Sequence, residues 1–137
     1  MKQSRLASAR ADGFTMIELL VVITLIVILA TVGMAQYRNS VTRAEEAVLK
    51  ENLFRMRDAI DQFYADKNKY PTDLAELSSE SYIREVPTDP MTKLKDTWTT
   101  TQAEPDANNP ASQVGIYDVK SGSDRTALDG TRYADWN

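Results

Sequence analysis

The feature that most constrains this chain is an apolar run close to its N-terminus. Residues 11–35 read ADGFTMIELLVVITLIVILATVGMA, and no charged side chain occurs between Leu19 and Tyr37. A helix over residues 14–35 would be about 33 Å long, enough to cross a hydrocarbon core about 30 Å thick. The apolar region of a cleaved secretory signal is usually only about 7–15 residues long. The length of the run therefore favours a membrane-spanning helix over a secretory signal.

Charge and composition limit the function classes. The first 13 residues carry three basic side chains and one acidic one, whereas the remainder carries 13 basic and 19 acidic. Basic residues ahead of a span favour a cytoplasmic N-terminus, so we expect the rest of the chain to cross the membrane. The acidic body argues against nucleic acid as a partner, because phosphate contacts need clustered Lys and Arg. The absence of histidine and cysteine excludes disulfides and the histidine-based catalytic triads, so we expect no enzyme.

Beyond Tyr37 the helical pattern continues but becomes amphipathic. The apolar residues recur at steps of three and four, which predicts one stripe along a helix: Val41, Ala44, Val48, Leu49, Leu53, Met56, Ile60, Phe63 and Tyr64. The opposite, solvated face is expected to carry the charged residues Arg43, Glu46, Lys50, Arg57 and Asp61. No proline interrupts this pattern before Pro71, so the sequence predicts one helix from Phe14 to about Asp66.

The C-terminal half predicts a small sheet that covers this amphipathic stripe. A short helix over Asp73–Leu77 is expected after Thr72, which offers a hydroxyl as its N-cap. Residues 96–101 and 113–119 are rich in Thr, Val, Ile and aromatic residues and predict two strands. Two strands need the cover of a helix to be stable. The predicted fold class is therefore α+β, a long N-terminal helix packed against a small antiparallel sheet, with a C-terminal loop.

The stretch GFTMIELLVVITLIVILA resembles the prepilin signature of type IV pilins and type II secretion pseudopilins. Its marks are a glycine, a phenylalanine directly after it, and a glutamate five residues after the glycine. Farther along, YADKNKYPTDLAEL, VPTDP and YDVKSGSD follow one another in the order found in the major pseudopilins, the G subunits of type II secretion systems. The resemblance implies a pilin-like fold.

The resemblance also implies how the N-terminus is processed. A membrane-embedded prepilin peptidase would cut between Gly13 and Phe14 and methylate the new amino terminus of Phe14. The implied organisation is a leader peptide over 1–13, a transmembrane and filament-core helix over 14–37, and a pilin-like head over 38–137.

Glu18 is the one acidic residue between Phe14 and Ala35. A carboxylate at the centre of a bilayer is penalised by roughly 2.5–3.5 kcal/mol. In the family that this stretch resembles, the glutamate at the position of Glu18 pairs with the N-terminal amine of a neighbouring subunit. Such a partner offsets the cost of desolvating the carboxylate. The resemblance therefore implies that Glu18 sets the register of assembly. The alternative is a carboxylate near the membrane interface with no specific role.

The C-terminal loop SGSDRTALDG is similar to a calcium-binding loop of the G subunits, although it contains fewer glycines. The resemblance implies that Ser121, through its carbonyl, and the carboxylates of Asp124 and Asp129 hold a structural calcium ion. Calcium takes six to eight oxygen ligands, and Gly122 and Gly130 would help backbone carbonyls to point inward. The spacing does not follow the EF-hand pattern, and turn chemistry alone also explains Asp, Ser and Gly in a loop.

The function implied is that of a major pseudopilin subunit of a type II secretion system. Such a subunit is held in the bacterial inner membrane by a single span, with its head in the periplasm, and polymerises through helix packing into a pseudopilus that drives export of folded proteins. Its partners would be further copies, the prepilin peptidase, minor pseudopilins and the inner-membrane assembly platform.

Two alternatives stay open. One is a type IV pilin for adhesion or motility, although most such pilins close a C-terminal loop with a disulfide and this chain has no cysteine. The other is a single-pass anchored binding domain that never polymerises. The family also commonly has a proline where Ala35 stands, so the state of the helix near Gly33 is open as well.

Overall fold

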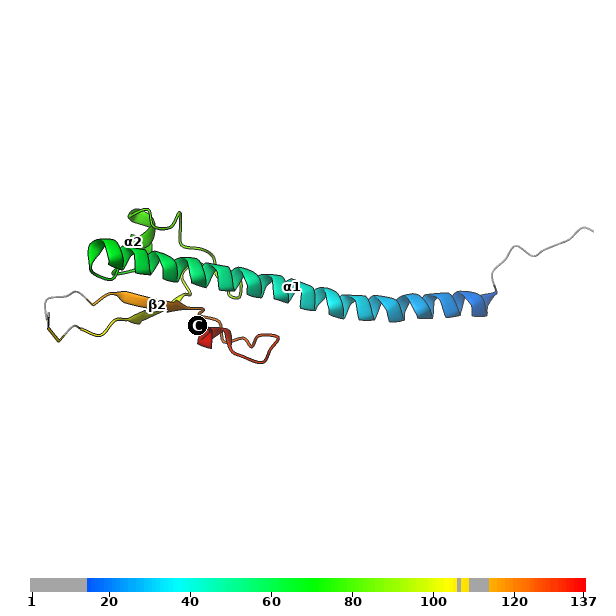
Figure 1. Cartoon of the computed structure of the whole chain (residues 1–137). Helices are drawn as coiled ribbons and strands as arrows, with labels where there is room; N and C mark the ends of the chain where they lie inside the picture. The colour runs from blue at the N-terminus through cyan, green and yellow to red at the C-terminus, as the bar shows by residue number, and fades with distance from the viewer. Residues whose placement is uncertain (1–14, 106, 109–113) are drawn as a thin grey trace, which may run out of the picture. The chain divides into compact units, whose positions relative to one another are not determined.

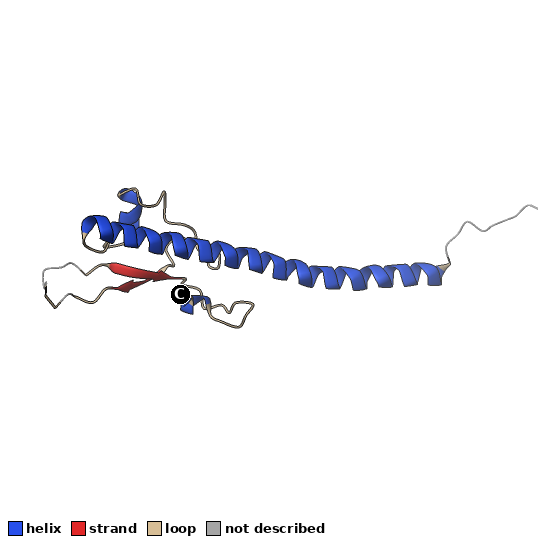
Figure 2. Cartoon of the chain, in the orientation of Figure 1, coloured by secondary structure: helices blue, strands red, loops and turns tan. Residues whose placement is uncertain are grey.

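The computed structural model describes residues 15–105, 107–108 and 114–137. The chain divides into two compact units between Arg38 and Asn39, and α1 contributes to both. We call the second one, residues 39–137, the head unit. The elements are α1 (Met16–Lys67), α2 (Leu74–Ser79), β1 (Thr99–Gln102), β2 (Ile116–Lys120) and a short 3-10 helix, η1 (Tyr133–Asp135) (Figures 1 and 2).

The first part of α1 is a continuous apolar helix whose side chains are exposed on all sides. It reaches a mean hydropathy of 2.7 over 18 residues, which makes α1 long and apolar enough to cross a membrane. The hydroxyls of Thr24 and Thr31 donate hydrogen bonds to the carbonyls of Leu20 and Ile28, each at 2.7 Å. These polar groups are therefore satisfied within the helix, as a lipid environment requires.

The second part of α1 is the backbone of the head unit. Its buried residues are Leu49, Leu53, Met56, Ala59, Ile60 and Phe63. This spacing confirms the predicted apolar stripe over its central length. Val41, Val48 and Tyr64 lie at the edge of the stripe and are partly exposed.

The core is completed by residues from every later part of the head unit. They are Leu77, Met91, Trp98, Ile116, Val119, Ala127 and Tyr133. The Phe63 ring also meets that of Tyr82 edge-on, with centroids 5.3 Å apart. The predicted α+β fold is confirmed, since a long helix packs against a two-stranded antiparallel sheet.

Helix α2 begins one residue later than the sequence suggested. Asp73, not Thr72, is its N-cap, and the Asp73 carboxylate accepts the Glu76 N–H at 2.8 Å. The Glu76 carboxylate reaches back to accept the N–H and the hydroxyl of Thr72, at 2.6 and 2.9 Å. The Glu76 side chain thus bonds back to the start of the helix, as in a capping box, with Thr72 as the donor. These hydrogen bonds lower the pKa of Glu76.

Strands β1 and β2 pair in antiparallel register, from Thr99 opposite Lys120 to Gln102 opposite Ile116. The register shifts between Thr101 and Gln102, where the partner strand has one additional residue, Tyr117. A regular strand would place Ile116 and Val119 on opposite faces, and the irregularity lets both reach the core. Tyr117 is exposed as a result.

Candidate assembly site and the C-terminal segment

Glu18 lies in the first turn of α1 with its side chain exposed. Its backbone N–H donates to the Thr15 hydroxyl at 3.2 Å, so Thr15 satisfies one of the free amides at the start of the helix. A carboxylate in this turn also interacts favourably with the helix dipole. The position leaves the carboxylate accessible to a partner from outside the chain. Gly13 and Phe14 lie outside the described residues, so cleavage and methylation there stay predictions.

In the head unit, two adjacent glutamates on α1 hold different parts of the chain. The Glu45 carboxylate accepts from the Lys93 ammonium at 2.6 Å. Glu46 Oε1 accepts both the Tyr133 hydroxyl, at 2.8 Å, and the Leu128 N–H, at 2.9 Å. The expectation that Glu46 lies on a solvated face is wrong, because the C-terminal segment, residues 121–137, packs over that side of the helix.

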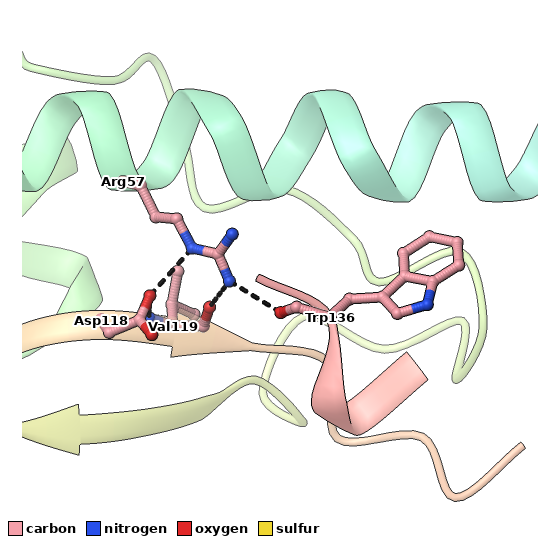
Figure 3. A network of polar contacts seen from close by, with 4 residues as sticks. All are labelled: Arg57, Asp118, Val119 and Trp136. Carbon is pink, nitrogen blue, oxygen red and sulfur yellow. Dashed lines mark hydrogen bonds and ion pairs between the residues drawn. The ribbon is translucent and has the colours of Figure 1, made fainter. Parts of the chain in front are cut away.

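Arg57 was expected on the same solvated face and is also a contact residue. Its Nε donates to Asp118 Oδ1 at 2.8 Å, and one terminal nitrogen donates to the carbonyls of Val119 and Trp136, each at 2.9 Å (Figure 3). One guanidinium therefore joins α1, β2 and the end of the chain. The five fixed donors of arginine suit this role, which a lysine cannot reproduce. The Trp136 ring also lies under the Lys50 ammonium, 4.9 Å from its centroid.

Asp89 is a fully buried carboxylate. Its Oδ1 accepts the Met91 N–H at 2.8 Å, and its Oδ2 accepts the Ser121 hydroxyl at 2.6 Å. The Ser121 oxygen in turn accepts the Ser123 N–H at 3.2 Å. These contacts tie the loop after α2 to the start of the C-terminal segment. The burial of the Asp89 carboxylate had no signal in the sequence.

Tyr133 is the largest fully buried side chain in the described part of the head unit. Burial raises its pKa to about 12, and its hydrogen bond to the Glu46 carboxylate acts in the same direction. The hydroxyl is therefore neutral and a donor over the physiological range. Trp98 is also in the core, whereas Tyr117 is exposed.

The three residues expected to hold calcium have separate partners. The Ser121 hydroxyl is buried against Asp89. Asp124 has a side chain that is 95% exposed, 3.5 Å from the Arg132 guanidinium. Asp129 Oδ1 accepts both the hydroxyl and the N–H of Thr131, which lowers the pKa of Asp129. Among the described residues, no group of three or more acidic side chains could hold a metal ion. These donors do not fit a preformed calcium site.

Comparison with known proteins bears on the N-terminal motif first. Residues 8–34 match the family model of the prokaryotic N-terminal methylation motif. The chain is 25% identical over 100 residues to type II secretion system core protein G of Escherichia coli (strain K12), a match that covers 61% of this chain and 69% of that protein. It is 35% identical over 63 residues to the fimbrial protein EcpC of Eikenella corrodens, covering 46% and 41%.

The chain therefore resembles the pilin and pseudopilin superfamily, in its N-terminal methylation motif and in part of the sequence that follows. Members of this superfamily are structural subunits, not enzymes. A further relative, core protein G of Aeromonas hydrophila, is 30% identical over 63 residues, covering 46% of this chain and 44% of that protein. The chain thus spans less than half the length of two of these three superfamily relatives. No solved structure matches the chain significantly.

Proposed function

We propose that this chain is the major pseudopilin subunit of a type II secretion system. The observation that carries the proposal is the extent of the similarity to core protein G. The matches to the proteins of E. coli and of Pectobacterium carotovorum cover 61% and 59% of this chain, which is more than the motif at residues 8–34 accounts for. The matches to the fimbrial proteins cover 46% and 42%.

The physical basis of the proposal is that the two parts of α1 need different surroundings. Its first part exposes apolar side chains all round and needs lipid or other helices as its surroundings. Its second part carries the head unit and its core. A subunit of this kind is stored in the inner membrane by one span, with the head in the periplasm, and assembles with further copies through the apolar helices.

Processing and register complete the proposal. The prepilin peptidase cuts after Gly13 and methylates Phe14, and the resulting amine of one copy pairs with the Glu18 carboxylate of another. The exposed position of Glu18 near the start of α1 supports this pairing. Minor pseudopilins and the inner-membrane assembly platform are the further partners in this account.

A type IV pilin for adhesion or motility is the second candidate. It is favoured by the higher identity to fimbrial proteins, 35% to EcpC and 37% to FimA of Dichelobacter nodosus. The two candidates differ in what the cell loses when the chain is absent.

The deciding experiment is deletion of the gene in its native bacterium. We expect the culture supernatant to lose a set of folded secreted proteins while surface pili remain, and a plasmid copy should restore secretion. Loss of surface pili with unchanged secretion would instead support the pilin. Complementation with Glu18→Ala should fail while the protein is still found in the membrane. Complementation with Glu51→Ala, which removes an acidic residue of an exposed helix pair, is the matched control and should succeed.

A further inference from the structure

We propose that the C-terminal segment, residues 121–137, is closed onto α1 by the Glu46 carboxylate, and that this closure takes the place of a bound cation. The inference concerns the head unit alone and does not depend on whether the chain assembles. It departs from the calcium site that the resemblance to G subunits implied for Ser121, Asp124 and Asp129.

The first step is the contact itself. One oxygen of Glu46 accepts both the Leu128 N–H and the Tyr133 hydroxyl. These two donors lie 82 and 87 positions after Glu46 in the sequence. Hydrogen bonds to an ionised carboxylate are about twice as strong as those between neutral groups. Both donors therefore hold the C-terminal segment to a fixed point on α1.

The second step is the shape of the loop between these donors. The Ala127 N–H donates to the Thr131 carbonyl at 2.6 Å, and the Gly130 N–H donates to the Ala127 carbonyl at 3.0 Å. Thr126 and Arg132 form an isolated antiparallel bridge outside this turn. The turn is thus closed by its own backbone.

The third step is the chemistry that this loop presents to the helix. A cation site needs inward-facing oxygens, six to eight of them for calcium. Here the groups aimed at α1 are an N–H and an O–H, which bind an anion, and Glu46 supplies that anion. The loop also carries the two cationic side chains Arg125 and Arg132. These two cations balance the carboxylates of Asp124 and Asp129, and the groups that the loop aims at α1 are donors, not the inward-facing oxygens that a calcium site requires.

The fourth step concerns the carboxylates that remain. Asp129 is engaged by both donors of Thr131, and Asp124 faces solvent near Arg132. An ion bound by both carboxylates would have to compete with the Thr131 donors at Asp129 Oδ1 and with the Arg132 guanidinium beside Asp124. The head unit should consequently keep its fold, and any assembly that depends on it, when calcium is removed.

Thermal unfolding of a fragment with residues 39–137 tests this, since that unit contains its own core. We expect the midpoint to differ by less than about 1 °C between excess EDTA and millimolar calcium. Glu46→Ala should lower it by about 5–10 °C, because the Tyr133 hydroxyl loses its partner. Glu45→Ala removes only the pair with exposed Lys93 and is the matched control, with a shift of about 2 °C or less.

Limited proteolysis separates local opening from global unfolding. Trypsin cleavage after Arg125 and Arg132 should be faster in Glu46→Ala than in the wild type or in Glu45→Ala, at a temperature where all three remain folded. A midpoint that rises by several degrees with calcium and not with magnesium in the wild-type fragment would overturn the proposal. So would a Glu46→Ala fragment that resembles Glu45→Ala in both stability and cleavage.

Discussion

The Arg57 guanidinium lies 2.8 Å from the Asp118 carboxylate, although 61 positions separate the two residues in the sequence. Both side chains are about three-quarters buried, with 24% and 23% of their surface exposed. The same guanidinium donates two further hydrogen bonds, to the carbonyls of Val119 and Trp136 (Figure 3). This one side chain therefore fixes α1 against both β2 and the last residues of the chain.

Arg57→Ala should lower the free energy of unfolding of the head unit by about 2–3 kcal/mol. The reason is that the change leaves a carboxylate that is about three-quarters buried, and two carbonyls, without this donor. Urea denaturation followed by tryptophan fluorescence measures the loss. The matched control is Arg55→Ala, which removes an exposed ion pair with Glu51 one helical turn away and should cost about 0.3–0.5 kcal/mol. Equal losses in the two variants would contradict the role given to Arg57.

Asp89→Ala should destabilise the head unit by about 2–3 kcal/mol. It leaves the Ser121 hydroxyl and the Met91 N–H buried without an acceptor. Asp89→Asn keeps one acceptor oxygen and should cost less. Asp58→Ala, at an exposed position on α1, provides the control and should change stability by less than about 0.5 kcal/mol. Urea denaturation measures these differences. An Asp89→Ala variant with an unchanged free energy of unfolding would contradict the stabilising role given to the contacts of this carboxylate.

Tyr133 should make the head unit less stable in alkaline solution. Its pKa is about 12 in the folded state, against 10.0 for an unperturbed tyrosine. A raised pKa means that the stabilisation is complete below pH 10 and is lost as the pH rises from 10 towards 12. Tyr133→Phe is less stable at neutral pH but lacks this loss, so the two proteins should converge above pH 10. Tyr82, whose pKa is also raised, is present in both and cancels from the comparison.

Gly122→Ala should destabilise the head unit strongly, by about 3 kcal/mol. A Cβ at residue 122 would lie 1.9 Å from the Thr97 carbonyl oxygen, which belongs to the backbone and cannot move aside alone. Gly130 is the contrast, because it has open space around it and a φ of +88°. Gly130→Asn should cost less than Gly122→Ala, because the only penalty is the left-handed backbone, which asparagine tolerates better than most residues. Thermal unfolding of both variants gives the comparison, and a Gly122→Ala protein of normal stability would contradict the packing described.

The sequence was informative where periodicity controls structure. The steps of three and four along α1 follow from burial of one helix face, so Leu49, Leu53, Met56, Ile60 and Phe63 could be assigned to the core. The apolar run and its Gly-Phe-Glu motif were equally visible, because composition and short spacing are enough for both.

Long-range polar contacts could not be predicted from the sequence. Glu46 and Arg57 have the spacing of a solvated face, and the paths of β2 and of the C-terminal segment make them contact residues. The strands begin at Thr99 and Ile116, three residues after the starts of the predicted ranges 96–101 and 113–119. The sheet register depends on the irregularity at Tyr117, which places both Ile116 and Val119 in the core. No local sequence pattern predicts this irregularity.

The most direct test of the assembly account is the intact mass and N-terminal sequence of the protein isolated from its native membrane. We predict a chain that begins at Phe14 with a methylated amine, the group that Glu18 is proposed to pair with. A chain that begins at Met1, in cells with an active prepilin peptidase, would contradict the account and would support an anchored domain that does not polymerise.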